Sequence, residues 1–456
     1  MNSENKGSPR STFFLLSVLL LSGFALRLFL SRYLTFEFDF NTFRAWGNGI
    51  SKVGFSEFYD RYWCDYMPGY LYVLWLLDNI HSAFPKLQVK ILYKLPANLS
   101  DLGISVLIFF TLRRITNLKY ASLASLAYFF NPASLANSTF WGQVDSVHAL
   151  PLLLSVLLGL WGHLIPSAIF AGIAFMIKPQ SVVILPILGI FVIRYVVERI
   201  KEGTSTLRAS VIVLGVFAAL FMTVFVISMP YVWDKLNGDN LIGIFREPII
   251  LIKERFSTAY DQYKYASLNA FNFWGMFAMW KSDQIRFLGI TYQTWGTIIF
   301  GFFYAIIFCF LFSFELLKRK ELRNLETIGK QSPSGSTDDT GLTIHTSSAV
   351  MLILFALFLF VTRVHERHFL PTVVFFSLIA FRSYIYWLFY TLISATYVIN
   401  LLYAYIKYYP IKFFRPSLLE PYVSAMVLLL LIIFLLVLVD FIRNSFLVYK
   451  RKETVS

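Results

Sequence analysis

The chain has 456 residues, of which 57% are hydrophobic and only 14% are charged, and its formal net charge is +14. Soluble domains carry about 25% charged residues, so this composition excludes an ordinary soluble enzyme, a disordered chain and a nucleic-acid-binding domain, and it indicates a membrane protein. The positive charge has two interpretations: the cytoplasmic excess of Lys and Arg typical of membrane proteins, or basic residues that bind an anionic lipid headgroup.

Long apolar runs predict membrane-spanning helices along most of the chain. The first run, Ser11–Leu30, is long for a signal peptide and no small-x-small cleavage site follows it, so we expect a retained first span. The sequence therefore predicts an all-α, polytopic transmembrane bundle of about 12 spans. The further runs occupy residues 98–112, 120–137, 145–162, 164–178, 181–197, 208–230, 287–317, 348–362, 368–381, 384–406 and 421–447.

The stretch Tyr66–Phe84 decides the topology, because every later loop changes side if this stretch spans the membrane. It is apolar but contains Pro, Gly, Asp and Asn residues. When it is treated as a half-embedded helix on the outer side, basic clusters such as Arg113–Arg114 and Lys450–Lys452 fall on the cytoplasmic side. This arrangement satisfies the positive-inside rule, so we expect both termini in the cytoplasm.

The predicted spans form two modules joined by a long loop. Residues 1–10 are expected to form a cytoplasmic tail, 11–230 an N-terminal transmembrane module that includes the outer loop 31–97, and 231–286 a second outer loop. Residues 287–447 form a C-terminal module with a cytoplasmic linker at 318–347, and 448–456 a cytoplasmic tail. The outer loops are too long for simple connectors and should carry short interfacial helices. Residues 331–348 are rich in Ser, Thr and Gly, which predicts a flexible linker.

Polar clusters near the span ends supply the candidate functional residues. No glycine-rich nucleotide motif is present, and no Cys or His spacing predicts a metal site. Glu37 and Asp39 lie among aromatic residues just after the first span, where a carboxylate suits proton abstraction; the alternative is an acidic pair that faces water. Asp65 and Tyr66 precede Pro68, and the alternative for Asp65 is the cap of a helix that begins there.

Three further clusters lie at span junctions: Trp141, Gln143 and Asp145; Lys178 and Gln180; and Asn272. Aromatic faces and bidentate polar side chains are what a sugar ring needs from its site. Each cluster also has a structural alternative. Asp145 is placed to cap the next helix, Lys178 to extend its ammonium to the membrane interface, and Asn272 to belong to an interfacial aromatic anchor.

The segment 363–368 places several ionisable side chains beside apolar spans. Charges at such a depth are functional by default. Arg363, His365 and Arg367 are residue types that suit a phosphate. The alternative is a salt-bridge cluster with Glu366 at the membrane edge.

In this order, the clusters resemble the motifs of the GT-C superfamily of integral membrane glycosyltransferases. Asp39 or Glu37 matches the acidic residue that the family carries early in its first outer loop. Residues 65–68 are similar to the Asp-Tyr-Pro-Pro motif of dolichyl-phosphate-glucose glucosyltransferases, with Met67 in place of the first Pro. Residues 363–367 are similar to their His-x-His-Glu-Lys segment, with Arg at the first and last positions. Residues 141–146 and 269–274 resemble motifs of proteins related to GPI mannosyltransferase II.

The resemblance implies an inverting transfer of a hexose, with mannose favoured, from a polyprenyl-phosphate-linked donor to a hydroxyl of a glycan or glycolipid. The reaction would take place on the non-cytoplasmic face of the plasma membrane in a prokaryote, or of the endoplasmic reticulum in a eukaryote. No cofactor, metal or nucleic acid is implied. The expected roles are base for Asp39, with Glu37 as second choice; donor-phosphate binding for His365, Arg367, Arg363 and Lys178; and sugar or acceptor binding for Asp65, Tyr66, Trp141, Gln143, Asp145, Gln180 and Asn272.

Two other functions stay open at this point. A transporter or flippase of lipid-linked sugars would share the basic phosphate site but would not need Asp39, and many transporters are built from repeated halves. A structural subunit of a polysaccharide assembly complex is the third possibility. A large separation between Asp39 and residues 365–367 would contradict the enzyme hypothesis.

Overall fold

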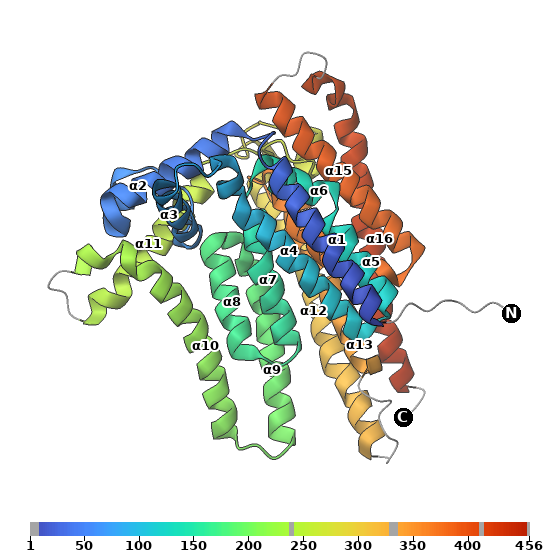
Figure 1. The fold of residues 1–456 in the computed structure, drawn as a ribbon. Helices are drawn as coiled ribbons and strands as arrows, with labels where there is room; N and C mark the ends of the chain where they lie inside the picture. Colours follow the sequence, from blue (N-terminus) through green and yellow to red (C-terminus); the bar gives the residue numbers. More distant parts are fainter. Residues whose placement is uncertain (1–8, 237–240, 328–335, 410–414, 454–456) are drawn as a thin grey trace.

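The computed structural model describes residues 9–236, 241–327, 336–409 and 415–453, which are mostly helical (Figure 1). The short turns are α6 (Pro132–Ser134), η1 (Leu135–Trp141), η2 (Pro179–Ile184), η3 (Met229–Tyr231), η4 (Trp233–Leu236), η5 (Phe273–Met276), η6 (Glu366–Phe369), η7 (Ala380–Arg382) and η8 (Pro416–Leu418). The strands β1 (Arg286–Phe287) and β2 (Ile290–Thr291) form an antiparallel hairpin. The helices are α1 (Pro9–Leu30), α2 (Glu37–Arg61), α3 (Pro68–Ala83), α4 (Val89–Ile115), α5 (Leu118–Phe129), α7 (Asp145–Leu160), α8 (Leu164–Ile177), α9 (Leu185–Lys201), α10 (Thr206–Ser228), α11 (Leu241–Asp261), α12 (Tyr292–Thr327), α13 (Ser336–Phe360), α14 (Leu370–Ser377), α15 (Tyr384–Tyr408) and α16 (Glu420–Glu453).

Within the described residues, eight helices are long and apolar enough to cross a membrane: α1, α4, α9 with the preceding η2, α10, α12, α13, α15 and α16. The prediction of an all-α membrane protein is therefore confirmed at this level. The remaining apolar runs form shorter helices, and α14 has only 8 residues. At about 1.5 Å per residue it covers roughly 12 Å, whereas the hydrocarbon core is about 30 Å thick. Every α14 residue is buried inside the protein, so its apolar run reflects packing and the count of about 12 spans is not confirmed.

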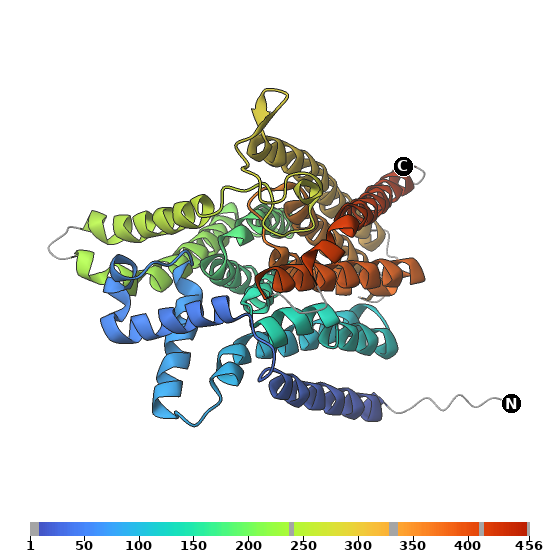
Figure 2. The same ribbon diagram turned by 90° about the horizontal axis from the view of Figure 1, so that it is seen from above.

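The helices differ in how much protein surrounds them. In its most apolar window, α13 is 89% buried, whereas α1 is 22% and α10 only 6% buried. Accordingly α1 lies at the edge of the bundle when the molecule is viewed from above (Figure 2). Helix α13 packs against α12, α14 and α16, and its side chains form much of the main hydrophobic core. An apolar helix face without protein partners is what lipid contact requires.

A separate layer of helices covers one end of the bundle. Helices α2, α3 and α11 lie there, while α1 begins and α16 ends at the opposite end (Figure 1). The ambiguous stretch Tyr66–Phe84 forms α3, which packs against α2, α4 and α8 and is not among the helices of spanning length. The cap of α3 is Met67, with no side-chain capping bond, so Asp65 does not cap this helix.

The prediction of a flexible linker at 331–348 is wrong for residues 336–348. Helix α13 already begins at Ser336, and residues 342–348 are mostly buried. Their hydroxyl groups are satisfied inside the bundle: Thr346 donates to Glu315 at 3.1 Å, and Ser348 donates to the carbonyl of Ile344 at 2.8 Å. Ser and Thr are compatible with a buried helix when they bond in this way. Residues 328–335 of the expected linker, and 1–8 and 454–456 of the expected tails, lie outside the described residues.

Candidate functional site

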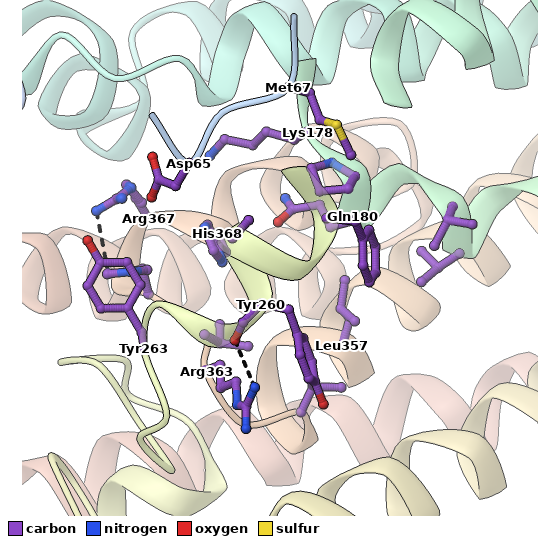
Figure 3. A pocket seen from close by; sticks show the side chains of 18 of the residues that line it. Asp65, Met67, Lys178, Gln180, Tyr260, Tyr263, Leu357, Arg363, Arg367 and His368 are labelled. Atoms are coloured by element: carbon purple, nitrogen blue, oxygen red, sulfur yellow. Dashed lines mark hydrogen bonds between the residues drawn. The ribbon is translucent and has the colours of Figure 1, made fainter. Parts of the chain in front are cut away.

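A cavity of about 320 Å³ opens at the end of the bundle that α2, α3 and α11 cover. Its walls come from the segment between α2 and α3, the junction of α8 with η2, helix α11, the end of α13 and the segment 361–368 (Figure 3). The structure thus brings together groups that are more than 300 positions apart in the sequence. Seven predicted site residues line the cavity: Asp65, Tyr66, Lys178, Gln180, Arg363, His365 and Arg367.

The cavity has a charged end and an apolar wall. Asp65, Lys178 and Arg367 gather toward one end, whereas Arg363 and Tyr260 lie at the other (Figure 3). The lining also includes the apolar side chains of Val182, Val183, Phe256, Leu357, Phe358 and Val361, which form an apolar wall. A ligand that fits both parts needs a polar or charged group joined to an apolar chain, and a lipid with a charged headgroup has this chemistry.

Lys178 reaches the charged end because a helix breaks at this point. Helix α8 ends at Ile177, and Pro179 prevents its continuation, so Lys178 adopts an extended backbone. Its side chain is buried and forms an ion pair with Asp145, which also accepts a hydrogen bond from Asn137 at 3.2 Å. The lysine therefore does not extend to the interface, and Asp145, which makes no capping bond, does not act as a helix cap.

Asp39 is held by two of the residues that the sequence suggested for sugar binding. Its Oδ2 accepts a hydrogen bond from Trp141 Nε1 at 2.8 Å and another from Gln143 Nε2. Both donors are buried, and the Trp141 ring stacks on Phe36 with 4.2 Å between ring centres. Trp141 and Gln143 therefore orient Asp39, and their expected direct contact with sugar is not supported.

The backbone turn at Gly142, between Trp141 and Gln143, sets the positions of these two donors. Gly142 has φ of 85°, a left-handed conformation that glycine adopts without strain. A Cβ at this position would also lie 2.9 Å from Cγ of Lys94. The Lys94 ammonium donates to the carbonyls of Ser31 and Phe140, each at 2.9 Å. One buried cation therefore joins the segment before α2 to the turn that holds Asp39.

The structure separates the two candidate bases. Neither Glu37 nor Asp39 lines the cavity, and Glu37 forms an ion pair with Lys90 of α4 at 2.7 Å. Asp39 instead lies within the electrostatic reach of Arg367. Burial lowers the pKa of Arg367, but the carboxylates of Asp39, Glu366 and Asp145 more than reverse this effect. Of the two candidate bases, Asp39 is the one whose charge acts on Arg367.

The segment 363–368 is anchored by residues between Tyr260 and Asp283. Arg363 has a left-handed backbone, with φ of 63°, and its backbone N–H donates to the carbonyl of Tyr265 at 3.0 Å. Its Nε pairs with Asp283 at 2.5 Å, and its Nη1 donates to the carbonyl of Tyr260 at 2.7 Å. The positive charge of Arg363 is therefore compensated without any ligand, and donor-phosphate binding by this residue is not supported.

Arg367 keeps unused hydrogen-bonding capacity. Its guanidinium lies 3.5 Å from both Glu366 Oε1 and His365 Nδ1, while its Nε and the Nε2 of His365 are buried without a partner among the described residues. Tyr397 of α15 donates to the Arg367 carbonyl at 3.0 Å and holds the backbone. Burial, then Arg367 and Lys178, lowers the pKa of His365, so this imidazole is neutral. Buried donors without partners beside a cavity indicate a site for an anion.

Asn272 has a structural role instead. It begins the turn η5, and its Oδ1 accepts a hydrogen bond from the backbone of Gly275 at 2.9 Å. It is fully buried and does not line the cavity. The prediction of sugar binding by Asn272 is therefore not supported.

Sequence reasoning gave no role to several residues that the fold brings to the site. Tyr263 and His368 line the cavity, and Asp283 neutralises Arg363 from a loop position 80 residues earlier. Nothing in the sequence around Asp283 marks it as a partner of Arg363. Glu366, by contrast, was visible as the only acid in the 363–368 segment.

The raised pKa of Glu366 predicts that the stability of the folded protein depends on pH. Burial raises the pKa of this carboxyl from 4.5 to about 7 in the folded protein, although Arg367 opposes the rise. Between pH 4.5 and 7 the unfolded chain releases this proton while the folded protein retains it, so this group makes the folded state less stable as pH rises. Glu366→Gln removes the effect. We expect a higher Tm than wild type at pH 8 and an equal Tm at pH 4; a variant that is less stable at pH 8 would contradict this account.

Within the described residues, no group of three or more His, Cys, Asp or Glu side chains is placed to hold a metal ion. No protein-family model matches the sequence, and a search of curated proteins finds no match. The resemblance to GT-C enzymes accordingly rests on the sequence motifs alone.

Proposed function

We propose that this chain is an integral membrane glycosyltransferase of the GT-C type. It transfers a hexose, with mannose favoured, from a polyprenyl-phosphate-linked donor to a hydroxyl of a glycan or glycolipid. The observation that carries the proposal is that Asp39, held in a fixed orientation by Trp141 and Gln143, acts electrostatically on Arg367, which lines a cavity with a charged end and an apolar wall. A base, a phosphate-binding cation and a place for a lipid chain are the three parts that this reaction needs.

In the proposed reaction, Asp39 removes the proton from the acceptor hydroxyl as that oxygen attacks the anomeric carbon. The bond from the anomeric carbon to the phosphate oxygen breaks, and the polyprenyl phosphate leaves with its electron pair. Trp141 and Gln143 keep the Asp39 carboxylate oriented throughout. Attack from the side opposite the leaving group inverts the anomeric centre.

The leaving phosphate gains negative charge, which Arg367 is placed to stabilise. His365 donates a neutral hydrogen bond, and Lys178 adds a positive field that Asp145 partly offsets. Burial raises the pKa of Asp65, with Arg367 acting in the opposite direction, so this residue is suited to a hydrogen bond with the sugar. Tyr66 and Gln180 complete the polar side of the cavity.

A transporter or flippase of lipid-linked sugars is the function that this arrangement favours less. Carrying a lipid across the membrane requires a phosphate site but no base held by two buried donors. The hydrogen bonds from Trp141 and Gln143 to Asp39 hold a carboxylate in a fixed orientation, which the enzyme hypothesis needs and the flippase hypothesis leaves without a purpose.

The direct test is to incubate the purified protein with radiolabelled mannosyl- and glucosyl-polyprenyl phosphate and a lipid extract of its host. We expect label to move from one donor to a new lipid or glycan product. Recovery of both donors unchanged, in a sample whose Tm shows it to be folded, would contradict the proposal.

We also propose that the chain makes about 12 crossings, with both termini in the cytoplasm and with α2, α3 and α11 on the outer face. The even number of helices of spanning length among the described residues, and the common end at which α1 begins and α16 ends, support the placement of both termini on one side. We expect tags placed after Ser456 and within residues 331–335 to be protected from membrane-impermeant reagents in intact cells. Labelling of either tag from outside would contradict it.

A further inference from the structure

The segment between α2 and α3 is fixed through its backbone carbonyls. Trp46 of α2 donates from its indole to the carbonyl of Trp63 at 2.9 Å. The Tyr59 hydroxyl, also from α2, donates to the carbonyl of Tyr66 at 2.8 Å. The non-helical stretch that carries Asp65 is therefore held on both sides of this residue.

A third hydrogen bond comes from a different part of the chain. Arg255 of α11 donates from Nη1 to the carbonyl of Cys64 at 3.0 Å, and its guanidinium carbon lies 4.6 Å from the centre of the Tyr59 ring. Cys64 is fully buried, so water does not replace this donor. A buried carbonyl without a donor is costly, and the segment would move to satisfy it.

The position of Arg255 links two walls of the cavity. Its neighbour Phe256, together with Tyr260 one turn later, contributes to the wall on the α11 side. The carbonyl that Arg255 holds belongs to the residue directly before Asp65, which lies at the charged end. Arg255 itself does not line the cavity, and the carbonyl that it holds is one residue from Asp65, which does.

We propose that Arg255 is a positioning residue for Asp65: its guanidinium holds the buried carbonyl of Cys64 and thereby fixes where the Asp65 carboxylate enters the cavity. The role of Asp65 toward the sugar rests on the proposed function. The restraint on the segment does not, and the two are tested separately.

The first experiment uses Cys64 as a reporter of the segment. In a Cys309→Ser background, Cys64 is the only thiol, and we expect it to react slowly with a maleimide in detergent. Arg255→Met keeps much of the side chain's volume but removes the donors, and should raise the reaction rate roughly tenfold. Arg255→Lys, which retains a donor, should give a reaction rate between those of wild type and Arg255→Met. The exposed neighbour Lys253 provides the control, and Lys253→Met should leave the rate unchanged. Equal protection in Arg255→Met would overturn the proposal.

The second experiment measures the affinity of a short-chain mannosyl-phosphate lipid for wild type, Arg255→Met, Asp65→Asn and the double variant. If Arg255 acts through Asp65, each single variant should bind the lipid about tenfold more weakly than wild type. The double variant should then lose no more affinity than either single variant. Effects that multiply to about a hundredfold would show independent action and overturn the proposal. A wild type that binds neither this lipid nor its glucosyl analogue would contradict the proposed function, while the Cys64 reaction rates would still decide the role of Arg255.

Discussion

Asp39→Asn should lose about 10²–10⁴-fold in turnover, because asparagine keeps the size of the side chain but cannot accept the proton of the acceptor hydroxyl. Asparagine still presents an oxygen to Trp141 and Gln143, so the local structure should survive. Donor affinity should change little, since the phosphate contacts come from other residues. The measurement is turnover and donor affinity of the purified variant beside wild type.

Glu37→Gln is the matched control, because Glu37 lies two positions earlier and its carboxylate is already paired with Lys90. We expect this variant to retain near-normal turnover. If Glu37→Gln is inactive while Asp39→Asn transfers sugar, the base is Glu37. If both variants transfer sugar normally, the first outer loop does not carry the chemistry.

Arg367→Ala should lose roughly tenfold to a hundredfold in turnover, because the phosphate charge is then less compensated as the bond breaks. Arg367→Lys keeps the charge without the planar fork and should lose less. Removal of Arg367 also leaves Glu366 without its nearest cation, so each Tm must be compared with wild type before activity is interpreted.

The exposed residue Arg199, which pairs with Glu202 at the end of α9, supplies the control for loss of an arginine. Arg199→Ala should transfer sugar at the wild-type rate. Wild-type turnover in a folded Arg367→Ala would remove Arg367 from the site.

The sequence predicted the helices better than their role in the membrane. The run 98–112 lies inside α4, and the run 384–406 lies inside α15. Apolar composition reports removal from water, however, and does not distinguish burial in protein from burial in lipid. This is why the run 368–381 was counted as a span, although it contains the short, fully buried α14.

The candidate site was predicted as a set of residues but not as a set of partners. Asp39, Lys178 and Arg367 lie where the sequence placed them, near the ends of apolar runs. Their pairing depends on tertiary structure: Lys178 meets Asp145 across 33 positions, and Arg363 meets Asp283 across 80. Residue type indicates that a side chain can bind phosphate or sugar, but only the fold shows whether its charge and hydrogen bonds are already used.

Purified protein in liposomes that contain labelled mannosyl-polyprenyl phosphate and an acceptor lipid extract gives the most direct test of the central claim. The account predicts that label leaves the donor and appears in a new product, that unlabelled polyprenyl phosphate accumulates in equal amount, and that Asp39→Asn abolishes both changes. Movement of the intact donor across the bilayer without any product, at the same rate in wild type and Asp39→Asn, would contradict it.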